Sequence, residues 1–174
     1  MKQIQEYELM LDIFDNLPRK AKILILENDV FNKEMIQSIG LALAYPKIES
    51  PIEKIFLTAF LICNKYNIFI EPQTKIKCGD NTYYADFTIT YDHYVNHMFH
   101  DNFKLVIECD GYEFHQKSKK QVEYDNKREY DLKMEGYDIL RFSGSEIYNQ
   151  PIQCVKKVFD YISKVHSKNG FFHE

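Results

Sequence analysis

The chain has 174 residues, of which 45% are hydrophobic and 28% are charged, and its formal net charge is −4. This length and composition fit one globular domain, which excludes a disordered chain, and the acidic balance excludes a protein that coats nucleic acid by bulk charge alone. Four cysteines without a C-x-x-C pair argue against a disulfide framework, and with no export signal and no run of about 18 apolar residues we expect a cytoplasmic protein without a membrane partner.

The front of the chain predicts three helices. Apolar residues recur at helical spacing over residues 4–14, and residues 32–44 show a second amphipathic pattern. A third helix begins after Ser50, because Pro51 suits the first helical position and Glu53 completes a capping box with Ser50.

In the rest of the chain the spacing of the apolar residues changes from helical to strand-like. Three short β-rich runs within residues 68–111, separated by turn residues, predict an antiparallel meander. A polar helix, a strand over residues 137–144 and a last amphipathic helix follow. The predicted class is therefore α/β, in the order α-α-α-β-β-β-α-β-α. We expect one domain over residues 1–174, with residues 1–49 as a helical N-terminal extension packed on a core of residues 50–168.

Strand alternation places two carboxylates for chemistry. In YYADFTIT (residues 83–90) the apolar side chains share one face: Ala85, Phe87 and Ile89. Asp86 lies on the other face, and in FKLVIECD the polar face carries Glu108 and Asp110. If the two strands pair, Asp86 and Glu108 stand side by side and can hold a hard cation such as Mg²⁺. For Asp110, a plain D-G turn explains the residue equally well.

Four motifs occur in the order expected around a β-β-α-β core: YYADFTI, LVIECDGYEFH, the spaced residues Asp125, Arg128, Leu132 and Gly136, and ILRFSGSEI. Together they resemble the PD-(D/E)XK nuclease superfamily and, more narrowly, its branch related to very-short-patch repair endonucleases, over roughly residues 50–165. The resemblance implies a restriction-endonuclease-like mixed β-sheet flanked by helices. It also implies an endonuclease that uses Mg²⁺, or Mn²⁺, to hydrolyse phosphodiester bonds of nucleic acid, with DNA as the expected partner.

The resemblance also implies roles for single residues. Asp86 would be the motif aspartate that bridges metal and scissile phosphate, and Glu108 would be the second acidic ligand. The backbone carbonyl of Cys109 would be a further metal ligand. Glu53 matches an acidic residue that many members carry on the helix before the sheet, although a capping box explains this residue as well.

One position departs from the superfamily pattern, which expects a lysine where Asp110 stands. Another group must then orient or deprotonate the attacking water. His115 is our candidate, because related branches place a histidine just beyond the D-G turn and a neutral imidazole can accept a proton near pH 7. A solvated loop histidine is the plain alternative. Gln73, Lys117 and Lys120 are reserves, and Asp110 itself stays in the candidate catalytic set.

The basic side chains follow the carboxylates along the chain. Residues 1–116 hold 11 basic and 17 acidic side chains, whereas residues 117–168 hold 11 basic and 8 acidic ones. This bias suits an anionic substrate, and it also suits a solvated lysine-rich helix. The candidate nucleic-acid contacts are Lys117, Lys120, Gln121, Arg128 and Gln73.

The polar helix predicts an inner stripe of Gln121, Asp125, Arg128 and Leu132 at helical spacing. We expect Asp125 and Arg128, three residues apart, to form an ion pair, while Arg128 can also assist in binding phosphate.

Three histidines stand outside these motifs, in the connection between two predicted strands. His93, His97 and His100 have H-x3-H-x2-H spacing, which could hold zinc or belong to an exposed loop. Three functions therefore compete: a metal-dependent DNA endonuclease, an inactive nucleic-acid-binding domain on the same fold, and an unrelated α/β interaction domain. Nothing in the sequence indicates an oligomer.

Overall fold

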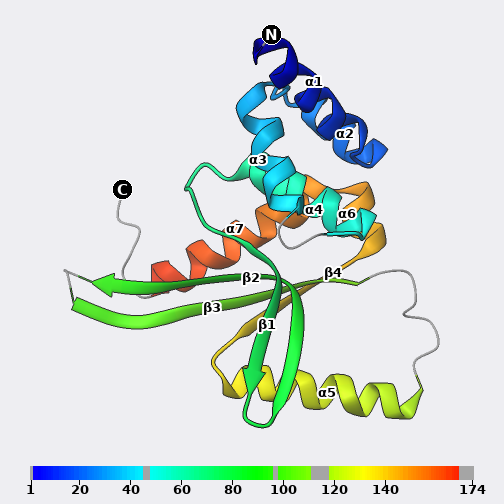
Figure 1. The fold of residues 1–174 in the computed structure, drawn as a ribbon. Helices are drawn as coiled ribbons and strands as arrows, with labels where there is room; N and C mark the ends of the chain where they lie inside the picture. Colours follow the sequence, from blue (N-terminus) through cyan, green and yellow to red (C-terminus); the bar gives the residue numbers. More distant parts are fainter. Residues whose placement is uncertain (1, 45–47, 96–97, 111–117, 169–174) are drawn as a thin grey trace.

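The computed structural model describes residues 2–44, 48–95, 98–110 and 118–168, and Figure 1 shows how they are arranged. The helices are α1 (Lys2–Asp15), α2 (Arg19–Glu27), α3 (Lys33–Ala44), α4 (Pro51–Cys63), α5 (Lys119–Met134), α6 (Gly144–Asn149) and α7 (Pro151–Lys168). The strands are β1 (Glu71–Cys78), β2 (Asn81–Val95), β3 (Met98–Asp110) and β4 (Asp138–Ser143). The α/β class is confirmed, but the predicted order omitted α2 and α6.

The four strands form one mixed sheet in the order β1-β2-β3-β4. The first three are antiparallel, so the predicted meander is confirmed, and β4 runs parallel to β3. A parallel pair needs a crossover connection, and α5 provides it. In this arrangement β3 lies in the middle of the sheet and ends beside β4, with Asp110 opposite Ser143.

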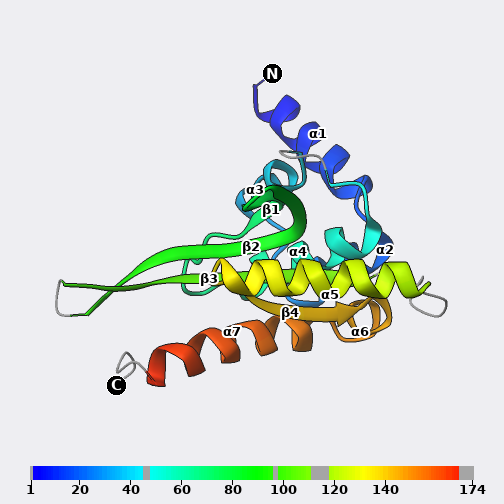
Figure 2. The same cartoon turned by 90° about the horizontal axis from the view of Figure 1, so that it is seen from below.

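Helices cover both faces of the sheet (Figure 2). The larger core joins α4, α6 and α7 to one face, and it includes stacked aromatic side chains such as Phe56 against Phe142. The smaller core lies on the other face, where Leu132 of α5 packs with Val106 and Tyr83. Helices α2 and α3 pack on α4 and contribute to the larger core. The sheet is thus enclosed between α4 and α5, and these two helices flank its carboxylates.

The apolar side chains of β2 before and after Asp86 point to opposite sides of the sheet. Ala85 belongs to the smaller core beside α5, whereas Phe87 and Ile89 belong to the larger core beside α4. The expectation that all three share one face is therefore wrong for Ala85. On β1, Gln73 falls between the residues paired with Ala85 and Phe87, and its φ of 52° lies in the left-handed region that non-glycine residues seldom adopt. The sheet is thus locally distorted at the position of Asp86.

The strands β2 and β3 also extend further than the sequence indicated. They continue as a two-stranded ribbon as far as Val95 and Met98, so His93 and His100 lie on strands and not in a connecting loop. The side chains of residues 93–101 are outside the described part of the structure. The proposed zinc site, which also needs His97, is therefore untested.

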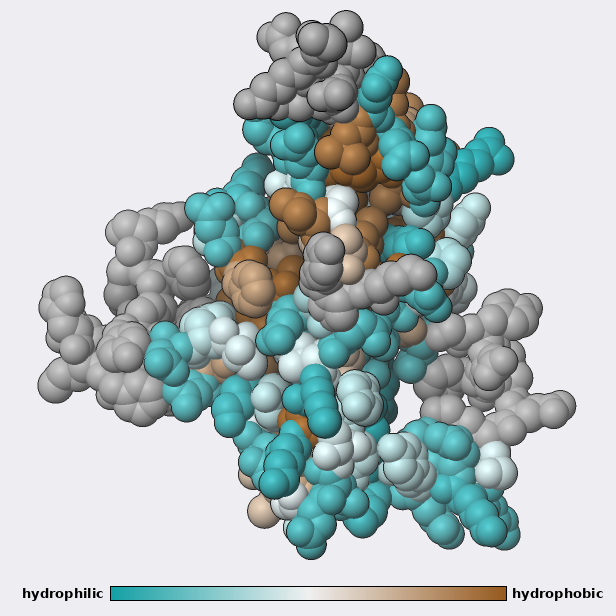
Figure 3. Space-filling model, viewed as in Figure 1, coloured by the Kyte–Doolittle hydropathy of each residue, from teal (hydrophilic) through white to brown (hydrophobic). Residues whose placement is uncertain are grey.

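All four cysteines are free thiols, as the sequence predicted. Among the described helices, none combines the length and the apolar character needed to cross a membrane. Exposed apolar side chains gather over the N-terminal helices, with Leu9, Leu26 and Leu41 all more than half exposed (Figure 3). The surface over α5 is mainly hydrophilic in the same view.

The short helix α6 depends on a complete capping box. The Ser143 hydroxyl accepts from the Glu146 N–H at 3.2 Å, and the Glu146 carboxylate accepts from the Ser143 N–H at 3.0 Å. We expect Ser143→Ala to lower the free energy of unfolding by about 1 kcal/mol, because one helix donor loses its acceptor. Urea unfolding with Ser163→Ala as control, an exposed serine of α7, measures this loss. An unchanged midpoint for Ser143→Ala would mean that water caps the helix equally well.

Candidate active site

Asp86 and Glu108 lie on neighbouring strands, just beyond the point where the pairing of β2 with β3 stops. The β2–β3 register pairs Phe87 with Ile107, and one further step places Asp86 opposite Glu108. Beyond the last backbone pair, the Asp86 side chain links β2 to β3, because its Oδ2 accepts a hydrogen bond from the Cys109 N–H at 2.7 Å. The structure therefore brings together the two carboxylates that strand alternation predicted as neighbours.

A third carboxylate comes from the start of α4. Ser50 caps this helix as predicted, with its hydroxyl accepting from the Glu53 N–H at 3.4 Å. The Glu53 carboxylate is held by the sheet, because its Oε2 accepts from Nε2 of Gln73 at 2.6 Å. A capping box alone therefore does not explain Glu53, which is tied to the distorted part of β1 that faces Asp86.

These carboxylates influence one another. The pKa of Asp86 is raised to about 6, mainly by burial and also by the charges of Glu53 and Asp110, although the Cys109 hydrogen bond and the positive charge of Arg128 lower it. Burial likewise raises the pKa of Glu108, to which the charge of Asp86 adds. Burial also raises the pKa of Glu53, and the charge of Glu108 adds to this shift. We call Glu53, Asp86, Glu108 and Asp110 the carboxylate cluster. Burial is the largest cause of the raised pKa of Glu53, Asp86 and Glu108, and repulsion within the cluster adds to it.

Each of the two central carboxylates keeps one oxygen that receives no hydrogen bond from the part of the chain that the structure describes. Oδ2 of Asp86 and Oε1 of Glu108 are hydrogen-bonded, whereas Oδ1 of Asp86 and Oε2 of Glu108 accept nothing from the described residues. Both residues are largely buried, so such acceptors need a partner. Mg²⁺ suits this donor set, because it binds through one or two carboxylates and keeps several waters. Within the described residues no group of three or more His, Cys, Asp or Glu side chains is arranged for a metal.

Arg128 contacts the cluster from α5. Its Nη2 donates to Oε1 of Glu108 at 2.5 Å and to the Tyr84 carbonyl at 2.8 Å. The expected ion pair with Asp125 is absent from the described ion pairs, and Asp125 instead accepts from Nε2 of Gln121 at 3.0 Å. The stripe itself is as predicted toward its end, where Arg128 and Leu132 face the sheet. Sequence spacing indicated the right face for Arg128 but the wrong partner.

The remaining described candidates lie either at the carboxylate cluster or at the start of α5. Asp110 is half-buried at the end of β3, and Gln73 contacts Glu53. Lys120 and Gln121 are exposed in the first turn of α5. His115 and Lys117 lie outside the described residues, so their roles remain predictions.

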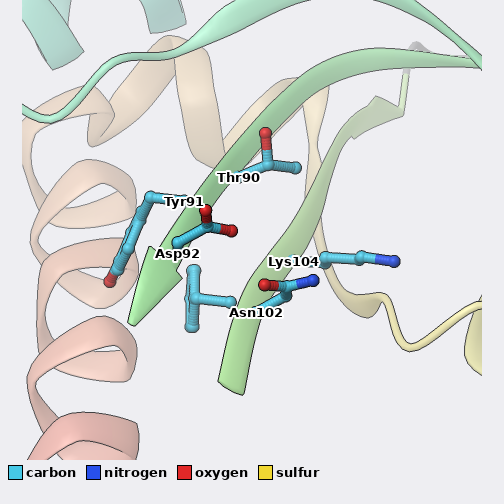
Figure 4. A pocket seen from close by; sticks show the side chains of 6 residues that line it. Thr90, Tyr91, Asp92, Asn102 and Lys104 are labelled. Carbon is cyan, nitrogen blue, oxygen red and sulfur yellow. The ribbon is translucent and has the colours of Figure 1, made fainter. Parts of the chain in front are cut away.

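A pocket of about 300 Å³ lies elsewhere on the sheet (Figure 4). It is lined by residues of the β2–β3 ribbon, among them Thr90, Asp92, Asn102 and Lys104. The sequence analysis gave no signal for it. Lys104 is already engaged there, since its Nζ donates to the Glu135 carbonyl at the end of α5. The pocket is separate from the carboxylate cluster, which lies further along both strands.

A mixed sheet with a helical crossover and acidic residues on two neighbouring strands agrees with the expected restriction endonuclease-like fold. The chain belongs to the family REase_MTES_1575, a restriction endonuclease-like family whose model matches residues 70–162, just over half of the sequence. No curated protein and no solved structure matches the chain. The matched segment contains Asp86, Glu108 and Arg128, whereas Glu53 and the N-terminal helices lie before it.

Proposed function

We propose that this protein is a cytoplasmic endonuclease that hydrolyses phosphodiester bonds of DNA with Mg²⁺, or Mn²⁺, as cofactor. The observation that carries the proposal is the pair of buried carboxylates on neighbouring strands, each with one oxygen left for a cation, within a restriction endonuclease-like family. The spacing of the D-G turn and His115 supports the narrower kinship with very-short-patch repair endonucleases.

The residues divide the work as follows. Asp86 and Glu108 would hold the metal, with the Cys109 carbonyl as a further ligand. Glu53, which Gln73 holds in place, would add a third carboxylate near them. When bound, the metal supplies a Lewis acid for in-line attack by water and compensates charge on the phosphate. His115 orients the water or accepts its proton, and Asp110 adds negative charge to the cluster.

Nucleic-acid contacts would come from the basic part of the chain that follows the cluster. Lys120 and Gln121 are exposed at the start of α5, where they can meet phosphate groups. Lys117, Arg128 and Gln73 complete the proposed set.

One observation favours a second function. Asp110 stands where the superfamily pattern expects a lysine, so the protein could bind nucleic acid without cleaving it. The third interpretation, an unrelated α/β interaction domain, is contradicted by the family assignment.

Supercoiled plasmid separates the two functions. We expect nicked or linear DNA with Mg²⁺ or Mn²⁺ and intact plasmid with a chelator, because the site needs a divalent cation. Gel shifts on the same plasmid report binding. Binding without cleavage under every metal condition would identify an inactive binding domain.

A separate prediction tests His115. We expect His115→Ala to lower the cleavage rate by about 10² to 10⁴, with metal and DNA affinity almost unchanged, because a general base acts on the transition state. Lys117→Ala and Lys120→Ala should instead weaken DNA binding, more at low salt than at high salt. Single-turnover cleavage and fluorescence anisotropy measure the two effects. If His115→Ala cleaves at the wild-type rate while either lysine variant binds DNA but is inactive, the lysine is the catalytic group.

A further inference from the structure

The face of β3 that carries Glu108 lacks the lysine that the superfamily pattern expects there. Residues 108 and 110 are two apart on one strand, so their side chains lie on the same face. A lysine at position 110 would therefore place its ammonium group beside the Glu108 carboxylate, and this chain has Asp110 there. Another cation stands beside Glu108 instead, because the Arg128 guanidinium reaches its Oε1 from α5.

Arg128 is not a surface partner of Glu108. The two side chains are 14% and 11% exposed, so this ion pair is shielded from solvent, unlike most pairs on protein surfaces. The second hydrogen bond of Arg128 goes to the carbonyl of Tyr84, two residues before Asp86 on β2. Arg128 therefore connects α5 to both strands that carry the central carboxylates, and its position is fixed from two sides.

The guanidinium also has donors to spare. Both hydrogen bonds use Nη2, while Nε and Nη1 make none with the described residues. Donors that no described residue engages are available to an acceptor of a bound ligand. The planar fork of a guanidinium matches two oxygens of one phosphate group. Arg141 is no equivalent, since its Nη1 is paired with Glu129 at 2.9 Å and its side chain is 38% exposed.

We propose that Arg128 supplies the positive charge of the missing motif lysine, while the proposed role of His115 toward the attacking water is kept. Through Nη2 it fixes Oε1 of Glu108 and leaves Oε2 for the metal, and through Nε and Nη1 it binds the scissile phosphate as a catalytic residue. This inference rests on the proposed nuclease function. The positive side chain then comes from α5 and not from position 110 of β3. Asp110 therefore does not by itself predict an inactive protein.

The test removes the positive side chain from α5 and places a lysine at position 110 of β3. We expect Arg128→Met to lower the single-turnover cleavage rate by about 10² to 10³. We also expect it to lower the melting temperature without metal by about 10 °C, because Glu108 loses its buried partner. Adding Asp110→Lys to Arg128→Met should restore at least about tenfold of the rate and part of the melting temperature. Arg141→Met, which removes a more exposed ion pair on the same sheet, is the control and should stay within about threefold of the wild-type rate.

Several results would overturn the inference. One is a folded Arg128→Met variant with the wild-type rate, and another is a folded double variant as inactive as the single one. If Arg128→Met does not fold, the double variant is compared directly with wild type, and a folded double variant within about tenfold of its rate supports the inference. If neither folds, Arg128→Lys decides, since it retains the charge: a folded variant within about a hundredfold of the wild-type rate supports the inference, and a slower one overturns it. A wild-type protein that cleaves nothing refutes the nuclease proposal separately, whatever the melting temperatures show.

Discussion

Replacing Asp86 by Asn, or Glu108 by Gln, should lower Mg²⁺-dependent cleavage by at least about 10³ while the protein stays folded. Each change keeps the size of the side chain and an oxygen that can accept the bond seen in the structure, from the Cys109 N–H or from Arg128. What each loses is the negative charge that a hard cation requires. Because the metal supplies most of the proposed rate acceleration, the loss should exceed that expected for a single hydrogen-bond donor.

Plasmid cleavage under single-turnover conditions measures this effect, with circular dichroism to show that each variant is folded. Asp80→Asn is the matched control, because Asp80 is exposed in the turn between β1 and β2 and should retain full activity. Variants that unfold would make the two carboxylates structural residues. Folded variants with wild-type cleavage would place the active site elsewhere.

The sequence predicted the pairing of the carboxylates better than the shape of the strand that carries one of them. Alternation placed Asp86 next to Glu108 because it needs only the strand period and the neighbouring position of two strands. The same rule failed at Ala85, since it assumes a regular strand and β2 changes face at Asp86. The left-handed backbone of Gln73 has no sequence signal, because glutamine seldom adopts it.

Local rules missed one partner and misjudged another. The capping rule correctly linked Glu53 to Ser50 but gave no sign of its bond to Gln73, and the i, i+3 rule paired Arg128 with Asp125. Such pairs contribute only a few tenths of a kcal/mol, whereas a buried Glu108 without a cation costs several kcal/mol. Burial of Glu108 therefore decides the partner of Arg128. This choice depends on the packing of α5 over the sheet, which no short sequence window contains.

Burial has a further consequence, which is that the metal-free protein should gain stability when Asp86 loses its charge. The pKa of Asp86 rises from 3.8 to about 6 on folding, so the folded state binds the proton more tightly than the unfolded state. The stability that Asp86 contributes as a protonated group is then fully present below pH 3.8 and is lost as the pH rises through about 6. At one pKa unit per 1.36 kcal/mol, the total loss is on the order of 3 kcal/mol.

Asp86→Asn removes this penalty, because asparagine stays neutral at every pH. Without metal, we expect the variant to exceed wild type at pH 8 by on the order of 3 kcal/mol in the free energy of unfolding, and to match it near pH 4. Urea unfolding with a chelator measures both differences, and Asp80→Asn should show neither. Saturating Mg²⁺ at pH 8 should then stabilise wild type more than the variant, since the variant keeps only Glu108 of the two proposed charged ligands. An equal difference at both pH values would mean that Asp86 has an ordinary pKa. A variant less stable than wild type at pH 8 would mean that the charged carboxylate, through its bond to the Cys109 N–H, holds β2 and β3 together.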